Sequence, residues 1–462
     1  MQDAAADAHR NQHRQHKHTS SLDARTRTGL IAVGVLLVLC VIAGGSSQES
    51  GIGVLAAQLL ALPLLAWAGW RLLRRPGSAI HVAWLVFALM LVAIPLLQAL
   101  LPASVAGGEG RTSLARDLAV FGMAGPSRWS LAPAASRAAG FTLLPALAIF
   151  AMTLALPRAA QRHLAQLVVA LAMASLLLGV VQLGAPQESP LNPYPQWAPA
   201  MNGFFANPNH QATLLVVAAT LACAHLAMVV GAWPPGRPHR MAHAVSSALV
   251  MLLAAVALPL TGSRAGVVLI ILASALVVIA HWPAWRGRLH TRLVLVACMV
   301  VAALALFLSL RWMQVEAIDE LRGPLRALTG EIAARFAPSG AGVGSYVPVF
   351  EQEAPRELLM ANYVNHAHNE YAQWWLEAGV SAVLAMLLGA IALALSLRAL
   401  LRQPAQARGL GVTALVALGA IMAHSLVDYP LRTPAMLAVA AVLAGIAAGQ
   451  ASSEVGSARA GA

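Results

Sequence analysis

Charged side chains are scarce in this chain: only 10% of its 462 residues are Asp, Glu, Lys or Arg, whereas 59% are apolar. A soluble core of this length does not need so large an apolar share. Cysteine is also rare, and its three residues, Cys40, Cys223 and Cys298, lie far apart within apolar runs. Neither a disulfide framework nor a cysteine metal site fits that spacing. These absences leave a membrane protein as the expected class.

Twelve apolar segments are each about long enough to cross a bilayer, for which a helix needs roughly 20 residues. A helix also satisfies its own backbone polar groups inside the hydrocarbon layer. We therefore predict an all-α, polytopic membrane protein with about 12 transmembrane helices. The predicted spans cover residues 29–45, 51–70, 79–101, 138–156, 163–184, 209–231, 241–260, 264–282, 291–310, 372–397, 408–428 and 433–449.

The basic residues predict on which side each loop lies. With the N terminus in the cytoplasm, every short cytoplasmic loop is basic, and most of the 18 acidic residues fall on the opposite side. The net charge of +12 is thus a signal of topology, and we expect no nucleic-acid partner because no basic face or nucleic-acid-binding module accompanies it. We expect a multi-pass protein of a bacterial inner membrane, with residues 1–28 as a disordered cytoplasmic tail and residues 450–462 as a second one.

Three predicted outer segments, 102–137, 185–208 and 311–371, carry most of the polar residues outside the tails. The last is a large periplasmic loop between span 9 and span 10, so that helices one to nine occupy 29–310 and helices ten to twelve occupy 372–449. Loops of that length are usually functional. Its first part is compatible with a helix that Gly323 and Pro324 interrupt. The glycine run 340–344 lacks the GK[ST] ending of a nucleotide loop, and we interpret it as a tight turn that brings two backbone segments together.

The large loop ends in a polar cluster directly before the tenth span. It contains His366, His368, Asn369, Glu370 and Tyr371. Because histidine accepts a proton near neutral pH, His368 is a candidate general base. A structural histidine that caps the span is the alternative. No Cys or acidic ligand stands at zinc-site spacing from the two histidines, so we predict no metal site.

Arginines on the same predicted side are candidates for anion binding. Arg264 begins the eighth span, and Arg322 and Arg326 lie in the large loop. A guanidinium at a membrane boundary usually has an anionic partner, and its rigid fork pairs with phosphate. Together these arginines could hold a diphosphate at the lipid surface. Snorkelling of Arg264 to lipid headgroups, and a solvated helix face for the other two, are the alternatives.

Polar residues also stand at two other span ends. Asn207 and Asn209 stand at the start of the sixth span, where they either cap its helix or bind sugar hydroxyls. His424 and Asp428 lie four residues apart near the end of the eleventh span, and we interpret Asp428 and Arg432 as an ion pair that holds the last hairpin together rather than as catalytic residues.

These residues together resemble the O-antigen ligase / Wzy-type O-antigen polymerase superfamily, which also includes bacterial O-oligosaccharyltransferases. The family is marked by a His-Asn-type pair, nine residues and a glycine, matched here by His368, Asn369 and Gly379; Ala382 departs from the small or hydroxylated residue that follows. The resemblance covers roughly residues 200–435. Four further stretches follow the family order: 205–210, 263–264, 322–325 leading to 342–344, and 424–432.

The resemblance implies a membrane glycosyltransferase that moves a glycan from undecaprenyl diphosphate to an acceptor hydroxyl at the periplasmic leaflet, with inversion and without a metal or other cofactor. His368 would be the base. The substrate-binding residues would be Arg264, Arg322, Arg326, Asn369, His366, Asn207 and Asn209.

Alternative functions differ in acceptor or in class. The acceptor is lipid A-core or a growing polysaccharide, or, in a protein O-oligosaccharyltransferase, a protein hydroxyl. A secondary transporter or flippase is the alternative from another class, but it would need ionisable residues near mid-span and internal repeats. Only His225 lies well inside a span, and the two halves show no obvious repeat.

Overall fold

The computed structural model describes residues 22–47, 51–74, 77–186, 188–194, 201–231, 238–281, 317–358 and 364–452. Within them every regular element is a helix, which confirms the all-α class. Eleven of these helices are long and apolar enough to cross a membrane by their length and composition. They are α2 (Ala24–Ala43), α3 (Ile52–Leu73), α4 (Ala79–Leu100), α6 (Pro133–Ala155), α7 (Arg158–Gly184), α8 (Pro208–Gly231), α9 (Pro238–Leu260), α10 (Arg264–His281), α15 (Val380–Leu401), α16 (Ala405–His424) and α17 (Pro434–Ser452).

These helices correspond to eleven of the twelve predicted spans, and the chain is a multi-pass membrane protein. The break predicted near residues 261–264 is confirmed, because α9 ends at Leu260 and α10 begins at Arg264. The predicted ninth span, 291–310, lies outside the described residues, and so do the start of the large loop, most of the N-terminal tail and the chain from residue 453 onward.

The predicted start of the tenth span is wrong. Residues 370–378 form a separate short helix, α14 (Glu370–Ala378), and the membrane helix α15 begins only at Val380. Gly379 between them has φ 53° and ψ −134°, a conformation that glycine alone adopts readily. A Cβ at this position would lie 2.1 Å from the carbonyl oxygen of Pro338. α14 therefore belongs to the large loop and meets α15 at a glycine corner.

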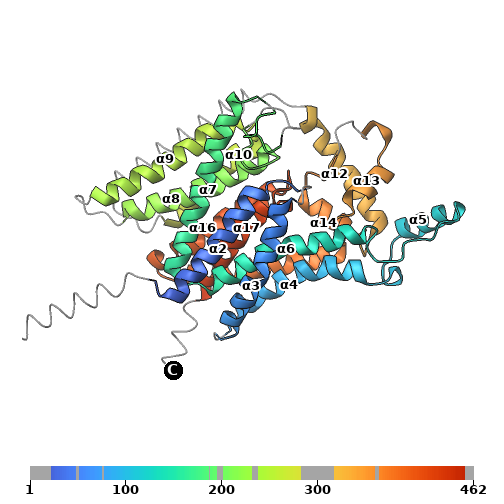
Figure 1. The fold of residues 1–462 in the computed structure, drawn as a ribbon, viewed down its shortest axis with the longest axis horizontal. Coiled ribbons are helices and arrows are strands. Elements are labelled where there is room, and N and C mark those ends of the chain that lie inside the picture. The colour runs from blue at the N-terminus through green and yellow to red at the C-terminus, as the bar shows by residue number, and fades with distance from the viewer. Residues whose placement is uncertain are drawn as a thin grey trace, which may run out of the picture.

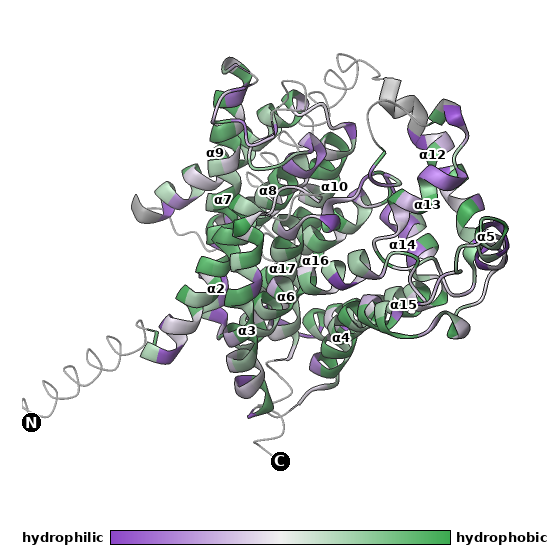
Figure 2. Ribbon diagram, turned by 45° about the vertical axis from the view of Figure 1, so that its right-hand side comes forward, coloured by the Kyte–Doolittle hydropathy of each residue, from purple (hydrophilic) through white to green (hydrophobic). Residues whose placement is uncertain are grey.

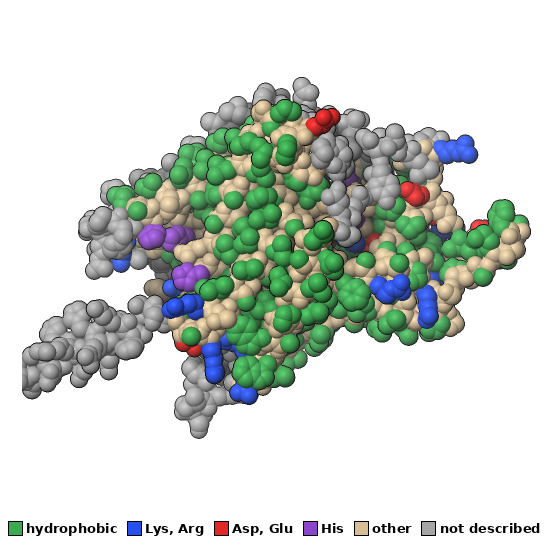
Figure 3. Space-filling view, in the orientation of Figure 1, with side chains coloured by type: hydrophobic (Ala, Val, Ile, Leu, Met, Phe, Trp, Pro, Cys, Tyr) green, Lys and Arg blue, Asp and Glu red, His purple; other side chains and the backbone are tan. Residues whose placement is uncertain are grey.

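Helix α17 lies at the centre of the bundle, where α2, α6, α15 and α16 contact it (Figure 1). Its sequence is rich in alanine and glycine, which lets neighbouring helices approach closely. A Cβ at Gly445 would lie 2.7 Å from the Thr153 Cβ on α6. Apolar side chains cover the outer surface of the bundle that Figure 3 shows, as expected for a surface in contact with lipid.

The remaining helices gather at one end of the bundle, which we call the loop end (Figures 1 and 2). The predicted interruption at Gly323 and Pro324 is absent, because α12 continues through both residues. The loop-end elements are η1 (Ala103–Val105), α5 (Glu109–Val120), α12 (Ala317–Phe336), α13 (Tyr346–Glu353), η3 (Arg356–Leu358), α14 and η4 (Pro430–Arg432).

The glycine run of the large loop forms the predicted close approach of backbone segments. Gly340 and Gly342 have φ values of 76° and 112°. The Gly342 amide donates to the Glu377 carbonyl at 2.7 Å, and a Cβ at Gly342 would lie 2.2 Å from the Ser130 Oγ. Only glycine fits such contacts. The run thus ties the segment before α6 to the end of α14.

Candidate active site

Four segments that are distant in the sequence meet at the loop end. They are the start of α8, the chain that follows α16, the segment 364–369 before α14, and helix α12, which contributes Arg322. Asp428 joins three of them, because Asn207 donates to its carboxylate, His368 contacts it, and Arg322 donates to the carbonyl of the preceding residue, Val427. The site is therefore centred on Asp428.

His368 occupies a constrained position at this centre. Its φ is 48°, and it is the one residue other than glycine with positive φ in the described part of the chain. Such a conformation persists only where the surroundings enforce it. Its Nδ1 lies 3.5 Å from Asp428 Oδ1, and 18% of the side chain is exposed. His368 is thus fixed in orientation and still partly accessible.

Asn369 supplies much of that constraint. Its Oδ1 accepts from the Ala372 amide at 3.0 Å and caps α14, while its Nδ2 donates to the Leu426 carbonyl at 2.9 Å. The next amide, of Glu370, donates to the Ser425 carbonyl at 2.9 Å. These bonds attach the start of α14 to the end of α16. Asn369, predicted to bind substrate, has both side-chain polar atoms committed within the protein.

Asp428 is completely buried, and its contacts favour the ionised form. Asn207 Nδ2 lies 3.2 and 3.4 Å from its two oxygens, and the Tyr429 amide donates to Oδ1 at 2.8 Å. Burial by itself would raise the pKa of Asp428, but the contacts with His210 and His368 outweigh burial and hold this pKa well below its ordinary value. A negative charge beside His368 is therefore part of the site.

The Tyr429 ring lies between three histidines. Its centroid is 4.9 Å from that of His210, 4.2 Å from that of His366 and 5.0 Å from that of His368. Burial raises the pKa of Tyr429, so its hydroxyl keeps its proton. The ring acts as a rigid spacer that holds the imidazoles apart.

His366 differs from His368 because both of its ring nitrogens have partners in the protein. Its Nε2 lies 2.9 Å from Ser47 Oγ, and its Nδ1 contacts the amide group of Gln373. Burial, followed by the positive charge of Arg432, lowers the pKa of His366 well below its usual value. A neutral, doubly hydrogen-bonded imidazole is suited to holding segments together, and substrate contact remains only a prediction for it.

The three arginines predicted to bind the diphosphate lie at different positions relative to Asp428. Arg322 Nη1 donates to the Val427 carbonyl at 3.1 Å, so Arg322 adjoins the centre of the site. Arg326 lies one turn further along α12 and is exposed. Arg264 begins α10, whose first turn packs on the first turn of α8: a Cβ at Gly266 would lie 2.9 Å from the Ala212 Cβ. Arg264 therefore shares the loop end with the histidines.

The predicted capping role of Asn207 is confirmed. Its Oδ1 accepts from the Asn209 amide at 2.8 Å at the start of α8, while its Nδ2 serves Asp428. The Asn209 carbonyl accepts from Thr213 Oγ1 at 2.8 Å, and the Asn209 side chain is half-buried. Asn207 thus contributes to the site because its side-chain amide holds the Asp428 carboxylate in place.

The predicted ion pair between Asp428 and Arg432 is wrong. Arg432 Nη1 donates instead to Glu377 Oε2 at 2.8 Å, because Glu377 at the end of α14 is buried and needs a cation. Asp428 turns toward His368 and Asn207. Sequence reasoning thus missed Asp428 and Tyr429 as site residues, and the one available signal was an acid left in a polar turn directly after an apolar span.

A buried acid also lies behind His368. Glu370 Oε1 accepts from the Leu431 amide at 2.8 Å and from Ser425 Oγ at 3.1 Å. Burial raises the pKa of Glu370 to about 7, against the lowering effect of Arg432 and these hydrogen bonds. Glu370 thus ties η4 to the start of α14. Among the described residues, no three His, Cys, Asp or Glu side chains lie close enough together to hold a metal ion.

Comparison with known proteins agrees with the resemblance carried by the motifs. Residues 249–387 match the family model described as O-antigen ligase, a stretch that runs from α9 to the first part of α15 and includes Arg264, Arg322 and His368. No curated protein matches the chain. The chain is thus a multi-pass membrane protein in which residues 249–387 match the O-antigen ligase family model.

Proposed function

We propose that this protein transfers a glycan from undecaprenyl diphosphate to an acceptor hydroxyl at the periplasmic face of the bacterial inner membrane. The family is one of membrane glycosyltransferases of the O-antigen ligase or polymerase type, whose substrates are lipid-linked glycans. The observation that carries the proposal is the contact between His368 and the buried, ionised Asp428, with Arg322 bonded to the adjacent carbonyl.

His368 acts as the general base. Since its Nδ1 faces the Asp428 carboxylate at 3.5 Å, the proton of the neutral ring belongs on Nδ1, and Nε2 is the basic nitrogen. The acceptor O–H gives its proton to Nε2 while its oxygen attacks the anomeric carbon. Asp428 stabilises the imidazolium that forms, as a buried carboxylate does beside other catalytic histidines.

The leaving group is the diphosphate of the carrier. The bond between the anomeric carbon and the diphosphate oxygen breaks, and the electron pair stays on the diphosphate. A single displacement of this kind inverts the anomeric carbon. Arg322 and Arg264 offset the charge that develops, as guanidinium groups do in other phosphate sites, and Arg326 adds to the same positive field. No metal or organic cofactor takes part in the proposed step.

The acceptor is lipid A-core or a growing polysaccharide in this proposal. An acceptor hydroxyl on a protein would make the same chemistry an O-oligosaccharyltransferase reaction, since His368 removes a proton from any suitably placed hydroxyl. Assays with each acceptor class distinguish these outcomes directly.

The test is replacement of His368 by Ala in purified protein, with release of undecaprenyl diphosphate and glycan transfer as the readouts. We expect loss of transfer by about 100-fold or more, which is the range for removal of a general base. His243→Ala, an exposed histidine on α9, is the control and should keep full activity. Transfer should also persist after chelation of divalent ions. Normal turnover by the folded His368→Ala protein would refute the base assignment.

A further inference from the structure

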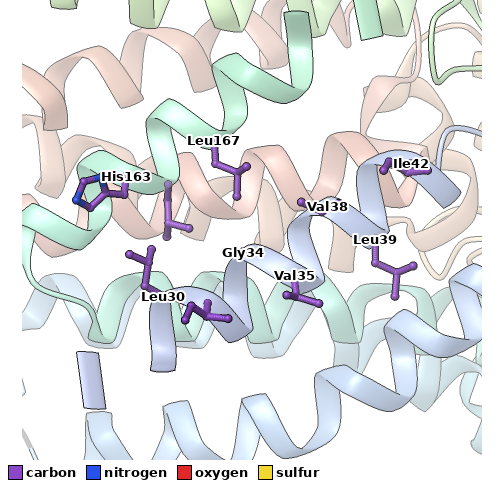
Figure 4. A pocket seen from close by; sticks show the side chains of 10 residues that line it. Leu30, Gly34, Val35, Val38, Leu39, Ile42, His163 and Leu167 are labelled. Atoms are coloured by element: carbon purple, nitrogen blue, oxygen red, sulfur yellow. The ribbon is translucent and has the colours of Figure 1, made fainter. Parts of the chain in front are cut away.

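An open groove with a volume of about 590 Å³ lies between α2 and α7 on the membrane-facing surface of the bundle (Figure 4). The two helices diverge from the end that holds Leu30 and His163 toward the end that holds Ile42. All of the lining side chains are apolar except His163. The groove therefore suits a hydrocarbon chain, and it is narrow at one end and wide at the other.

Its length and floor suit a lipid chain. From Leu30 to Ile42 the helix rises about 18 Å at roughly 1.5 Å per residue, which is more than half of the hydrocarbon thickness of a bilayer. Gly34 keeps the middle of the groove open, because a Cβ there would already lie 3.4 Å from Leu167 Cδ2 across the gap. A larger side chain at Gly34 would fill the groove.

The wide end of the groove adjoins the candidate active site. Beyond Ile42 the chain leaves α2 at Gly44 and reaches Ser47, whose Oγ lies 2.9 Å from His366 Nε2. The His366 ring contacts Tyr429, which also contacts His368. A lipid that lies in the groove with its headgroup at the wide end would thus place that headgroup next to His366, at the edge of the candidate active site.

The charges at the narrow end fix the direction of such a lipid. Arg27 and Arg162 are exposed there, and basic residues of this kind mark the cytoplasmic end of a span. The wide end then faces the periplasmic leaflet, where the diphosphate of the proposed donor lies. A chain that enters from that leaflet runs inward along Ile42, Val38 and Gly34.

We propose that the groove between α2 and α7 holds the polyisoprenoid tail of the diphosphate-linked donor and thereby sets the preference for carrier length. This inference rests on the proposed function for the identity of the headgroup. It assigns the tail to helices that lie outside the family-matched residues 249–387. An ordinary phospholipid chain is the competing occupant and is an outcome of the test.

Photolabelling tests occupancy without reference to transfer. The protein in nanodiscs is irradiated with undecaprenyl diphosphate that carries a diazirine in its tail, and labelled peptides are identified by mass spectrometry. We expect labels within residues 30–42 and 163–167, and competition by unlabelled undecaprenyl diphosphate but not by an excess of phosphatidylglycerol. Equal competition by both lipids, or labels elsewhere only, would overturn the proposal.

Filling the groove tests its role in turnover. Gly34→Leu should raise KM about tenfold for a donor with a full-length tail, because two or three methylene groups lose their contacts. KM for the same glycan on a two-isoprene carrier should change less than about twofold. Val35→Trp is a second blocking variant at an exposed lining position. The matched control is Gly69→Leu on α3, where an added Cβ has no neighbour within 4 Å.

The two experiments separate failure of this inference from failure of the proposed function. If the wild-type protein transfers no glycan but its groove is labelled competitively, the tail site stands and the proposed reaction is wrong. If the wild-type protein transfers glycan and Gly34→Leu and Val35→Trp both leave the long-tail KM unchanged, the reaction stands and the groove assignment is wrong.

Discussion

In the proposed reaction, Asp428 determines which nitrogen of His368 acts as the base. The carboxylate is buried, accepts from Asn207 and from the Tyr429 amide, and faces His368 Nδ1. Replacing Asp428 with Asn keeps the shape and removes the charge that fixes the tautomer. We expect kcat to fall by about 100-fold or more, with the donor KM within about twofold, because the loss falls on proton transfer rather than on binding.

Steady-state kinetics of the purified Asp428→Asn protein measures this effect. The control is Asp117→Asn, an exposed acid on α5 that should leave both constants unchanged. A raised donor KM with normal kcat would show instead that Asp428 serves binding.

Glu370 makes the attachment of α14 sensitive to pH. Its pKa is raised from an ordinary value of 4.5 to about 7 by burial. Between these two values the unfolded chain ionises while the folded protein keeps the proton, so stability falls as pH rises from about 4.5 and the loss is complete above about 7. The shift corresponds to about 3 kcal/mol as an order of magnitude.

Glu370→Gln stays neutral at every pH and can still accept from Ser425 and Leu431. The wild-type midpoint of thermal unfolding should therefore drop by several degrees relative to this variant between pH 5 and pH 8. Melting curves of both proteins at the two pH values check this, with Glu351→Gln, an exposed acid on α13, as the control. A difference that does not vary with pH would contradict the raised pKa of Glu370.

At the scale of helices, the corner at Gly379 sets the position of α14 and the candidate site relative to the membrane helix α15. The residue has φ 53°, and a Cβ would lie 2.1 Å from the Pro338 carbonyl oxygen, so Gly379→Ala must displace either α14 or the glycine run. The backbone conformation alone costs about 1–3 kcal/mol for a residue other than glycine. We expect a lower unfolding midpoint and transfer reduced at least about tenfold, measured on the same preparation.

Gly323→Ala is the matched control for this substitution. Gly323 lies within α12, where an added Cβ meets nothing within 4 Å, and alanine favours a helix over glycine by about 1 kcal/mol. This variant should be as stable as the wild type or more stable. If both variants behaved alike, the corner would carry no special constraint.

The helices could be predicted from sequence wherever the signal is local. Apolar runs correctly predicted eleven spans, and polar breaks such as Thr261 to Arg264 correctly predicted where one span ends and the next begins. The start of α15 could not be found in this way, because Trp374, Trp375 and Leu376 are apolar and the one charged residue between them and the corner, Glu377, does not by itself separate two helices. Asp428 was missed for a different reason: its partner Asn207 lies 221 positions away, and sequence spacing suggested the nearer Arg432.

At the scale of the whole molecule, the proposed reaction requires the loop end to face the periplasm. The orientation rests on the basic residues at the opposite end of the bundle, such as Arg71 and Arg158, and on the positive-inside rule. Single cysteines placed in a cysteine-free chain can report it. Thr112 on α5 is exposed at the loop end, and Gly77 is exposed at the basic end before α4.

We expect Thr112→Cys to react with a membrane-impermeant maleimide in spheroplasts, and Gly77→Cys to react only after lysis. Both positions lie in water in either orientation, so a difference in labelling reports the side of the membrane rather than burial. The reverse pattern would place His368 and Asp428 in the cytoplasm, where the donor diphosphate of the proposed reaction is not presented. Labelling that supports the orientation would leave His368→Ala and Asp428→Asn as the decisive tests of the chemistry.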